Sequence, residues 1–559
     1  MSLPAAPPIT LTTPSLGVRQ WRDDADPGRT CIAWATTGGR GLPRSAILLP
    51  VAPVEGRWKP SDALLAALPD QLRHVRHLVR DLEAVYPESR EDPAAPRRLT
   101  VASNCGQQWG AHHLVVLLVY DEPRAVGDQG DLSQVVTAVE VEDVAAHQQE
   151  IKALEEFFDD ECYDDRLVTR GLVRLPALDA TDTPGTLVFA LASCQYPADM
   201  TDGAGGGPEP PASASLLRLS KLLTPAAPEA PSLLVLAGDQ VYVDATAGLF
   251  DARATTDRLR LPYQNLMGSP GAQAVFGLLP IAMVIDDHEI IDNWEPGVPI
   301  PAPTTKGQAM DAYRRFQRMA GPRLRDEQAL WCEFTYSGVP FFLGDTRTER
   351  HTPDETPRGV ANWREARIMR PPQWDALVAF LRRNAERVAF VITPSMLLPR
   401  DLGVGPEPSL ALEADDWDGY PASRDALLAL LCELDAQRVV FLSGDAHTSC
   451  VAEATVTRGA REARLWSVHS SGLYCPYPFA NGAEDDYAVE EIFDFPEGAP
   501  NSEQYHCVIR KRTWAPGDGF ATLNLKRHDD GYTLDVCFKR AGGDVPAPTL
   551  VMPDRARVS

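Results

Sequence analysis

The sequence predicts an α/β protein, because short apolar runs typical of buried strands alternate with a helical segment and repeatedly end in polar or charged residues. The run Leu233–Ala237 is entirely apolar, which fits a strand that is covered on both faces. Thr186–Ala192 is a second such run, and residues 216–223 between the two have the pattern of a short helix. This order predicts a βαβ unit, whose functional residues lie at the carboxyl ends of its strands.

The end of the run Leu233–Ala237 carries residues suited to metal binding. Gly238 allows a sharp turn, so that Asp239 leaves the strand end and Tyr242 returns to the same place. A carboxylate can bridge two cations, and a phenolate is a hard ligand suited to ferric iron. These residues alone leave a second interpretation open, in which Asp239 caps a helix and Tyr242 is a core residue.

Four further apolar runs end in the same way. Residues 186–192 precede Ser193-Cys194-Gln195, 281–285 precede Asp286-Asp287-His288-Glu289, 339–344 precede Asp345-Thr346-Arg347, and 438–443 precede Gly444-Asp445-Ala446-His447. Taken singly, Cys194 could be a buried thiol and His447 a hydrogen-bonded core histidine. Adjacent carboxylates at a strand end are costly unless cations or hydrogen bonds compensate, and strand ends of one sheet converge. We therefore predict a single metal cluster.

Size and composition limit the other possibilities. The chain has 559 residues, of which 44% are hydrophobic and 23% are charged, so it is long enough for two or more globular domains. A formal net charge of −25 disfavours nucleic acid and anionic membranes as partners. The ten cysteines form no CxxC pair, which argues against a zinc ribbon or a disulfide framework. We found no export signal and no long apolar segment, and therefore predict a cytoplasmic protein.

The first part of the chain carries no recognisable chemistry. Residues 30–36 and 114–120 have the pattern of strands, and residues 63–85 and 144–158 have apolar residues at helical spacing. The character of the sequence changes after residues 181–185. We therefore predict an N-terminal accessory domain over residues 1–183 and a second domain, which carries the metal motifs, over residues 184–559.

In order and spacing, the motifs resemble those of the PhoD-type alkaline phosphatases within the calcineurin-like metallophosphoesterases. The residues that carry the resemblance are Ala192-Ser-Cys-Gln195, Gly238-Asp-Gln-Val-Tyr242, Asp286-Asp-His-Glu289 with Asn293-Trp294, Asp345-Thr-Arg347 and Gly444-Asp-Ala-His447. The resemblance implies two packed mixed β-sheets flanked by helices, preceded here by a mainly β or α+β N-terminal domain. Two positions depart from the family pattern: Gly344 stands in place of the usual leucine, and Ile285 where an aromatic residue is common.

The resemblance also implies a role for each matching residue. Asp239 would bridge two metals; Cys194, Tyr242 and His447 would complete a ferric ion site; and Asp287, Asp445 and Asn293 would hold a second cation, Ca²⁺ in the family. His288 would stabilise or protonate the leaving oxygen, and Arg347, with Arg350 nearby, would bind the phosphoryl oxygens.

These roles predict a metal-dependent phosphomonoesterase or phosphodiesterase that acts on a small phosphate ester. Two cations about 3.5–4 Å apart lower the pKa of bound water, so that hydroxide is present near neutral pH and can attack phosphorus. Thiolate and tyrosinate around ferric iron should also colour the protein.

Two other hypotheses remain at this level. Cys194 could be the nucleophile of a cysteine hydrolase, activated by His288 or His447, although the nearby carboxylates would then repel the thiolate without any cation to offset them. Alternatively, the chain could be a non-catalytic interaction protein with a relict metal site.

Overall fold

The computed structural model divides the chain into two compact units, which are described separately. The first comprises Met1–Ala180, Tyr263–Ile281 and Arg314–Gly321, and the second Thr181–Pro262, Ala282–Tyr313 and Pro322–Ser559. The residues described are the strands within 16–174, and residues 186–553 without 197–210, 224–229, 245–254, 301–304, 320, 323–328, 355, 404–411, 413 and 476–483. The division into an accessory domain over residues 1–183 and a domain with the metal motifs over residues 184–559 stays a prediction.

The described strands of the first unit form two antiparallel sheets, with the orders β1-β2-β7-β6 and β4-β3-β8-β9, and with β5 paired to β3. Their bounds are β1 Leu16–Arg22, β2 Arg29–Thr36, β3 Pro43–Val54, β4 Arg57–Pro60, β5 Arg76–Leu78, β6 Glu83–Ala84, β7 Arg97–Ala102, β8 His113–Tyr120 and β9 Val168–Arg174. The predicted strands at 30–36 and 114–120 are confirmed as β2 and β8.

The prediction of a helix over residues 63–85 is wrong for the part of this range that the structure describes. Residues 76–78 and 83–84 are strands, because they pair with β3 and β7, and these long-range backbone hydrogen bonds override the local apolar spacing. The helix expected over residues 144–158 lies outside the described residues.

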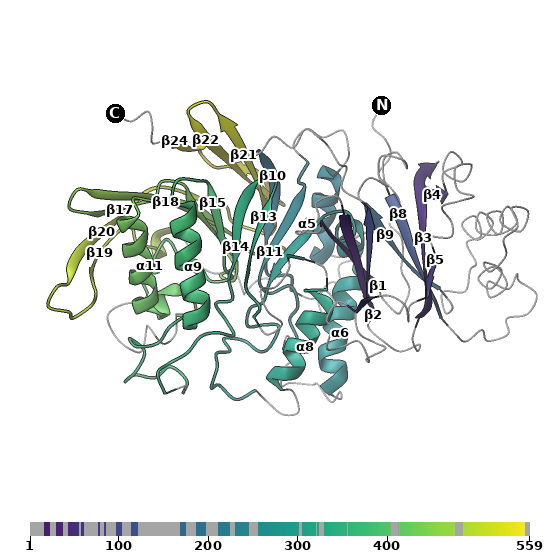
Figure 1. Cartoon of the computed structure of the whole chain (residues 1–559), viewed down its shortest axis with the longest axis horizontal. Coiled ribbons are helices and arrows are strands. Elements are labelled where there is room, and N and C mark those ends of the chain that lie inside the picture. Colours follow the sequence, from purple (N-terminus) through teal and green to yellow (C-terminus); the bar gives the residue numbers. More distant parts are fainter. Residues whose placement is uncertain are drawn as a thin grey trace, which may run out of the picture. The chain divides into compact units, whose positions relative to one another are not determined.

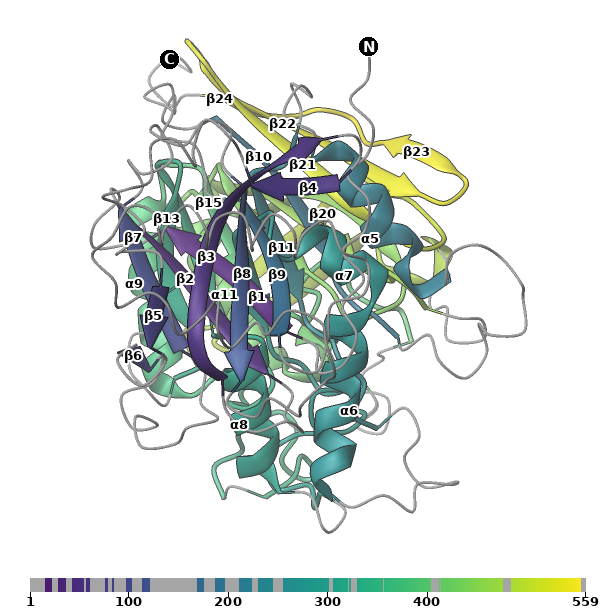
Figure 2. The ribbon, with the colours of Figure 1, turned by 90° about the vertical axis from the view of Figure 1, so that its right-hand side faces the viewer.

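One mixed sheet of the second unit has the order β12-β11-β10-β21-β22-β23, with β24 also paired to β22. Its strands are β10 Leu187–Ala192, β11 Leu233–Ala237, β12 Ile281–Val284, β21 Gly519–His528, β22 Gly531–Arg540, β23 Gly543–Pro546 and β24 Leu550–Pro553. Strands β10 and β11 are parallel and fully or largely buried, as their apolar runs predict, whereas β10 and β21 are antiparallel. The C-terminal strands β22 and β23 form a hairpin that is prominent in Figure 2.

The other mixed sheet has the order β13-β14-β15-β16-β18-β17-β20-β19. Its strands are β13 Cys332–Tyr336, β14 Val339–Leu343, β15 Ala389–Ile392, β16 Val439–Ser443, β17 Ser449–Arg458, β18 Arg461–Ser470, β19 Glu490–Phe495 and β20 Glu503–Trp514. Strands β14, β15, β16 and β18 are parallel, so their carboxyl ends lie at one edge. Helices α9 (Pro371–Asn384) and α11 (Pro421–Glu433) lie over this sheet (Figure 1).

Aromatic side chains join the two mixed sheets. Phe189 of β10 makes edge contacts with Phe341 of β14 and Phe390 of β15, with ring centroids 5.9 and 5.2 Å apart. Phe341 in turn stacks on Phe390 at 5.0 Å and on Phe334 at 4.9 Å. Such pairs contribute about 0.5–1.5 kcal/mol each beyond the burial of their area. The predicted architecture of two packed mixed sheets flanked by helices is confirmed.

The remaining helices of the described chain are short. They are α5 Pro211–Leu222, α6 Thr255–Gly268, α7 Pro270–Val275 and α8 Lys306–Phe316, with the 3₁₀ turns η6 Trp417–Gly419 and η7 Glu484–Asp486. Helix α5 packs near β21 and confirms the short helix predicted between β10 and β11. Among the residues described, every helix is too short or too polar to span a lipid bilayer. The cytoplasmic location stays a prediction.

Candidate metal centre

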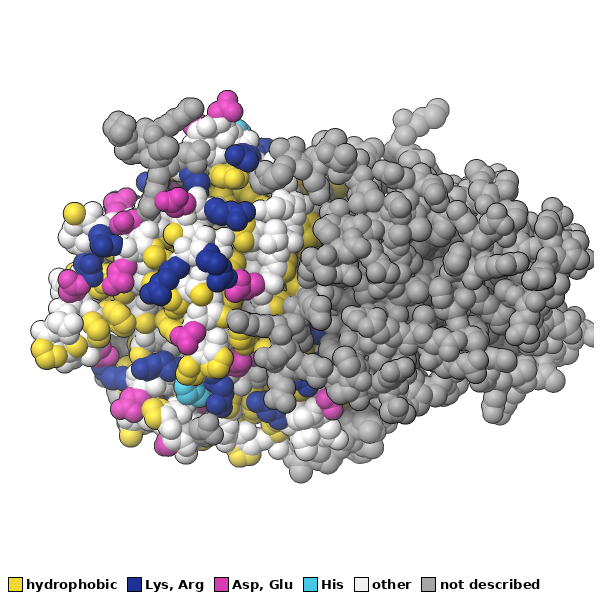
Figure 3. Space-filling model, in the orientation of Figure 1, with side chains coloured by type: hydrophobic (Ala, Val, Ile, Leu, Met, Phe, Trp, Pro, Cys, Tyr) yellow, Lys and Arg dark blue, Asp and Glu magenta, His cyan; other side chains and the backbone are white. Residues whose placement is uncertain are grey.

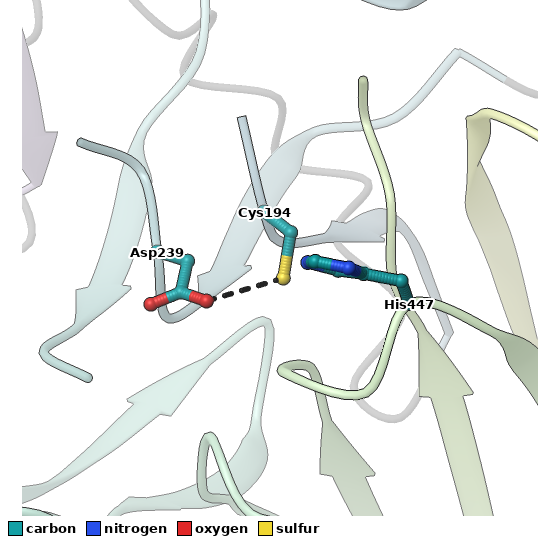
Figure 4. Close-up of side chains that lie close together, drawn as sticks. All are labelled: Cys194, Asp239 and His447. Atoms are coloured by element: carbon teal, nitrogen blue, oxygen red, sulfur yellow. Dashed lines mark hydrogen bonds between the residues drawn. The ribbon is translucent and has the colours of Figure 1, made fainter. Parts of the chain in front are cut away.

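Three strand ends bring a thiol, a carboxylate and an imidazole together (Figure 4). Cys194 follows β10, Asp239 follows β11 and His447 follows β16, and one ligand atom of each lies within 4.8 Å of the others. Cys194 Sγ lies 3.5 Å from Asp239 Oδ2. The Tyr242 hydroxyl lies 3.4 Å from the same oxygen and 3.2 Å from His447 Nε2. The structure therefore gathers the four residues expected around ferric iron.

A second group consists of carboxylates. Asp239, Asp286, Asp287 and Asp445 each place an oxygen within 4.8 Å of the others. Asp239, Asp287 and His288 form a third group by the same distance. Asp239 belongs to all three groups, so its position suits a carboxylate shared by two cations.

The backbone at these positions is strained. Within the described part of the chain, the non-glycine residues with positive φ are Cys194 (55°), Asp239 (56°), Asn293 (53°), Ser337 (48°), Asp435 (46°) and Asp445 (74°). Four of these six are predicted metal ligands. A left-handed backbone costs roughly 1–3 kcal/mol per non-glycine residue and is concentrated at functional sites, although aspartate and asparagine tolerate it better than most.

Two glycines and one glutamate let the ligand loops approach each other. A Cβ on Gly238, whose φ is +99°, would lie 2.8 Å from Asp286 Cβ, and one on Gly444 would lie 2.3 Å from a backbone oxygen. Buried Glu289 accepts hydrogen bonds from the backbone N–H groups of Gln240 and Asp286, both at 2.9 Å. This carboxylate fastens the loops after β11 and β12 together.

The electrostatics of the protein alone favour bound cations. Burial, followed by the charges of Asp287 and Cys194, raises the pKa of Asp239 well above its usual value, and burial likewise raises that of Asp445. Asp286 Oδ2 and Asp287 Oδ1 are buried and accept no hydrogen bond. The ligand atoms therefore fit two metal ions. The group of Cys194, Asp239 and His447 offers sulfur, oxygen and nitrogen, and the group of four aspartates offers oxygen alone.

The thiol of Cys194 and the imidazole of His447 shift each other's pKa. Burial opposes ionisation of Cys194, but its hydrogen bond with His447 and the charge of that residue lower the thiol pKa to about 6. Burial also disfavours charge on His447, yet Cys194 and Cys475 raise its pKa to about 12. Thiolate is the metal-binding form of cysteine.

His288 stands at the rim of the centre. Its Nδ1 lies 2.9 Å from the carboxylate of Asp244, its ring lies over Tyr242 with centroids 4.1 Å apart, and its side chain is 19% exposed. Burial lowers its pKa, but the charge of Asp287 and the hydrogen bond to Asp244 outweigh burial and raise the pKa to about 10. Asp244 therefore orients the imidazole, and the neighbouring carboxylates favour its protonated form in the metal-free protein.

The two predicted substrate-binding arginines are buried in an ion-pair cluster. Arg347 donates Nε to Asp286 at 2.7 Å and both Nη groups to Asp415 at 2.7 and 2.5 Å. Its Nη2 also lies 3.6 Å from Asp287 and 3.9 Å from Asp445. Arg350 donates Nη1 to Asp415 at 2.6 Å. Both guanidinium groups thus form ion pairs with carboxylates of the protein.

Asn293 is placed differently from the other expected ligands. Its backbone N–H donates to Asp287 Oδ2 at 2.6 Å, while the residue as a whole is exposed. The contact holds Asp287 in place, and a ligand role for the Asn293 side chain stays a prediction.

Asp244, Asp415, His469 and Cys475 were not anticipated as site residues. Asp244 lies two residues after Tyr242, and Asp415 belongs to the acidic stretch Asp415-Asp416-Trp417-Asp418, whereas Cys475 lies 28 residues after His447. Such short polar stretches occur widely in loops, so only the fold identifies them.

We expect His469 to make the stability of the metal-free protein fall in acid. This buried residue lies 2.9 Å from Ser443 Oγ through Nδ1 and 2.7 Å from the Ala446 carbonyl oxygen through Nε2. Burial lowers its pKa from 6.5 to about 4, so the folded state binds fewer protons than the unfolded chain. The contribution is complete above pH 6.5 and decreases by roughly 3 kcal/mol as the pH falls towards 4.

Denaturant unfolding at several pH values measures this effect. His469→Gln should flatten the acid dependence, whereas His506→Gln, at an exposed position on β20, should not. Equal acid dependence in wild type and His469→Gln would contradict the assignment.

Comparisons with known proteins agree with this geometry. Residues 221–481 match the model of the PhoD-like phosphatase family. Residues 221–481 of this chain are therefore similar to the PhoD-like phosphatases. Alkaline phosphatase D of Bacillus subtilis (strain 168) is 23% identical over 201 residues, which cover 32% of this chain and 32% of that protein. The match thus spans about a third of that relative.

Two solved structures have a similar fold. A structure of PhoD has a TM-score of 0.53 at 14% identity and covers 99% of this chain and 92% of its own. A purple acid phosphatase from yellow lupin (Lupinus luteus) seeds has a TM-score of 0.50 at 10% identity, with 97% and 74% coverage. At these identities the likeness shows the fold alone.

Proposed function

We propose that this chain is a metal-dependent phosphoric ester hydrolase that acts on a small phosphate monoester or diester. The observation that carries the proposal is the convergence of strand ends into three metal-capable groups that all contain Asp239. The PhoD-like family match over residues 221–481 supports the same chemistry.

The ligand chemistry supports Fe³⁺ with a divalent cation, Ca²⁺ by preference. Cys194, Asp239, Tyr242 and His447 would hold the ferric ion, because thiolate, phenolate, carboxylate and imidazole lie together there. Asp239, with Asp287, Asp445 and Asn293, would hold the second ion through oxygen atoms. When bound, the two cations lower the pKa of a water molecule and offset the charge of the phosphoryl group.

The chain's own residues supply proton transfer. The Nδ1 of His288 is engaged by Asp244, so Nε2 is the nitrogen that can hold a proton for the substrate. This arrangement suits a general acid that donates to the leaving oxygen. Asp292 lies 3.8 Å from Nε2, so each ring nitrogen of His288 has a carboxylate nearby.

Arg347 serves this site as a positioning residue as well as a source of positive charge. It joins Asp286 to Asp415 and directs Nη2 towards Asp287 and Asp445. Arg350 supports Asp415 from the other side. A direct contact of either guanidinium with the phosphoryl oxygens would require a rearrangement of this cluster on substrate binding.

The surface gives little support for a polyanionic partner. Acidic and basic side chains are interspersed over the described part of the face in Figure 3, and the whole chain has a net charge of −25. Such a surface favours a small phosphate ester over a nucleic acid.

The cysteine hydrolase hypothesis is disfavoured by the position of its nucleophile. Cys194 is fully buried, and its sulfur lies against Ser471 Oγ at 3.0 Å, Asp445 O at 3.3 Å and Asp239 Oδ2 at 3.5 Å. A nucleophile must reach the substrate, whereas a metal ligand is suited to this enclosure.

Removal of metal tests the proposal. We expect incubation with EDTA to abolish hydrolysis of p-nitrophenyl phosphate and of its bis ester, because the buried carboxylates cannot assist catalysis without cations. Iron and calcium should be lost together with activity, and their return should restore it. Activity that survives chelation but disappears on thiol alkylation would favour the cysteine hydrolase instead.

The visible spectrum tests the ferric site. Ferric iron bound by Cys194 and Tyr242 should give a charge-transfer band, and Tyr242→Phe should weaken or shift this band without unfolding the protein, because the phenolate oxygen is removed while the ring remains. A colourless protein fully loaded with iron would contradict Tyr242 as a ligand.

A further inference from the structure

The segment after β18 lies alongside the Cys194 loop like an additional strand. The Leu473 N–H donates to Ser193 O at 2.9 Å, and Tyr474 N–H donates to Cys194 O at 3.3 Å. In return, Tyr196 N–H donates to Tyr474 O at 3.0 Å, which completes a parallel bridge between the two segments. The next residue, Cys475, therefore enters the centre on a fixed backbone.

Cys475 is also held from the opposite side. Its backbone N–H donates to Asp518 Oδ1 at 3.1 Å, and Asp518 lies in the turn just before β21. Gly519 N–H donates to Gly472 O at 2.8 Å in the same region. The Cys475 side chain lies against the imidazole: its Sγ lies 3.0 Å from His447 Nδ1.

The two nitrogens of His447 therefore have different surroundings. Nε2 lies 3.2 Å from the Tyr242 hydroxyl, on the side of the metal-capable group with Cys194 and Asp239. Nδ1 faces the sulfur of Cys475. A histidine binds a metal through one nitrogen while the other N–H donates to an acceptor that fixes the tautomer and the ring orientation.

We propose that Cys475 is a positioning residue that accepts the hydrogen bond of His447 Nδ1–H, fixes the ring, and so presents the Nε2 lone pair to the metal. This inference rests on the proposed function. The usual acceptor in this role is a carboxylate, a carbonyl or a water, so the thiol is an uncommon choice. His447 would then have two cysteines beside it: Cys194 as a fellow metal ligand, and Cys475 as the acceptor at Nδ1.

Cobalt titration of the metal-free protein tests the role, because Co²⁺ absorption reports both affinity and ligand geometry. Cys475→Ala should bind Co²⁺ on the order of 10- to 100-fold more weakly than wild type, with an altered cobalt spectrum. Cys475→Ser retains an acceptor and should recover most of the loss. Cys537→Ser, at a half-buried cysteine on β22 away from the centre, is the matched control and should bind as wild type does.

The results separate this role from a structural one and from the proposed function. Wild-type affinity and spectrum in Cys475→Ala would overturn the inference while leaving the phosphatase proposal intact. Weak binding by a Cys475→Ser protein that melts at the wild-type temperature without metal would also overturn it, because an acceptor would then be present without effect. A wild-type protein that binds no metal and hydrolyses no phosphate ester would overturn both.

Discussion

Replacing Asp239 with asparagine should reduce phosphate ester hydrolysis by about a thousandfold or more, because the carboxylate common to all three metal-capable groups would lose its charge. Asparagine has nearly the same size, so packing at this fully buried position is preserved. Turnover and bound metal are measured together, and both should fall. Asp494→Asn, at an exposed position on the edge strand β19, is the control and should keep full activity.

The same substitution should not destabilise the metal-free protein. Burial and then the charges of Asp287 and Cys194 raise the pKa of Asp239, so an ionised carboxylate there disfavours the folded state at neutral pH. Without metal, Asp239→Asn should melt at or above the wild-type temperature. This opposition between stability and activity is typical of functional sites. Full turnover in Asp239→Asn would instead show that hydrolysis does not depend on this group of residues, as expected if the metal site is a relict.

Replacing Arg347 with methionine should lower the stability of the protein by roughly 3–5 kcal/mol, the usual effect of removing one partner from a buried ion pair. Arg347 is fully buried, and its loss would leave Asp286 and Asp415 facing each other without a cation between them. Thermal melting of the metal-free protein measures the effect. Arg364→Met, which removes an exposed ion pair with Glu497, should change little.

A second substitution distinguishes the loss of charge from the loss of packing. Asp415→Asn in the Arg347→Met background should recover part of the stability, since one unpaired carboxylate is removed. Arg347→Lys keeps the charge but not the planar fork that bonds Asp415 through both Nη groups, and should be intermediate. A fully stable Arg347→Met protein would show that the cluster contributes little to the fold.

Much of the second unit follows from local sequence. The apolar run at 233–237 is strand β11 with unchanged bounds, and the run at 339–344 is strand β14, which ends one residue earlier, because a run buried on both faces leaves a simple pattern. The helix expected over 63–85 shows the limit of such patterns: residues 76–78 pair with β3, a contact that the spacing of apolar residues cannot reveal.

Some residues of the candidate site can likewise be predicted from local sequence, and others cannot. The chemistry of Asp239, Asp287 and His447 is visible in the sequence because each residue lies shortly after the end of a buried strand. The strands belong to two sheets, β11 and β12 to one and β16 to the other, so only the packing of the two sheets brings the three strand ends together. Cys475 and Asp415 could not be predicted. Cys475 reaches His447 only because its segment bridges to the Cys194 loop, nearly 280 residues earlier in the chain.

Local patterning therefore determined the buried strands that precede the site motifs and the ligand-type residues that follow them. Tertiary structure alone decided which side chains surround those ligands: Asp244 beside His288, Asp415 beside Arg347, and Cys475 beside His447. The physical reason is that strand formation and strand-end chemistry depend on neighbours along the chain. Hydrogen bonds and ion pairs around the site depend on the packing of two sheets, which brings distant segments within about 3 Å of one another.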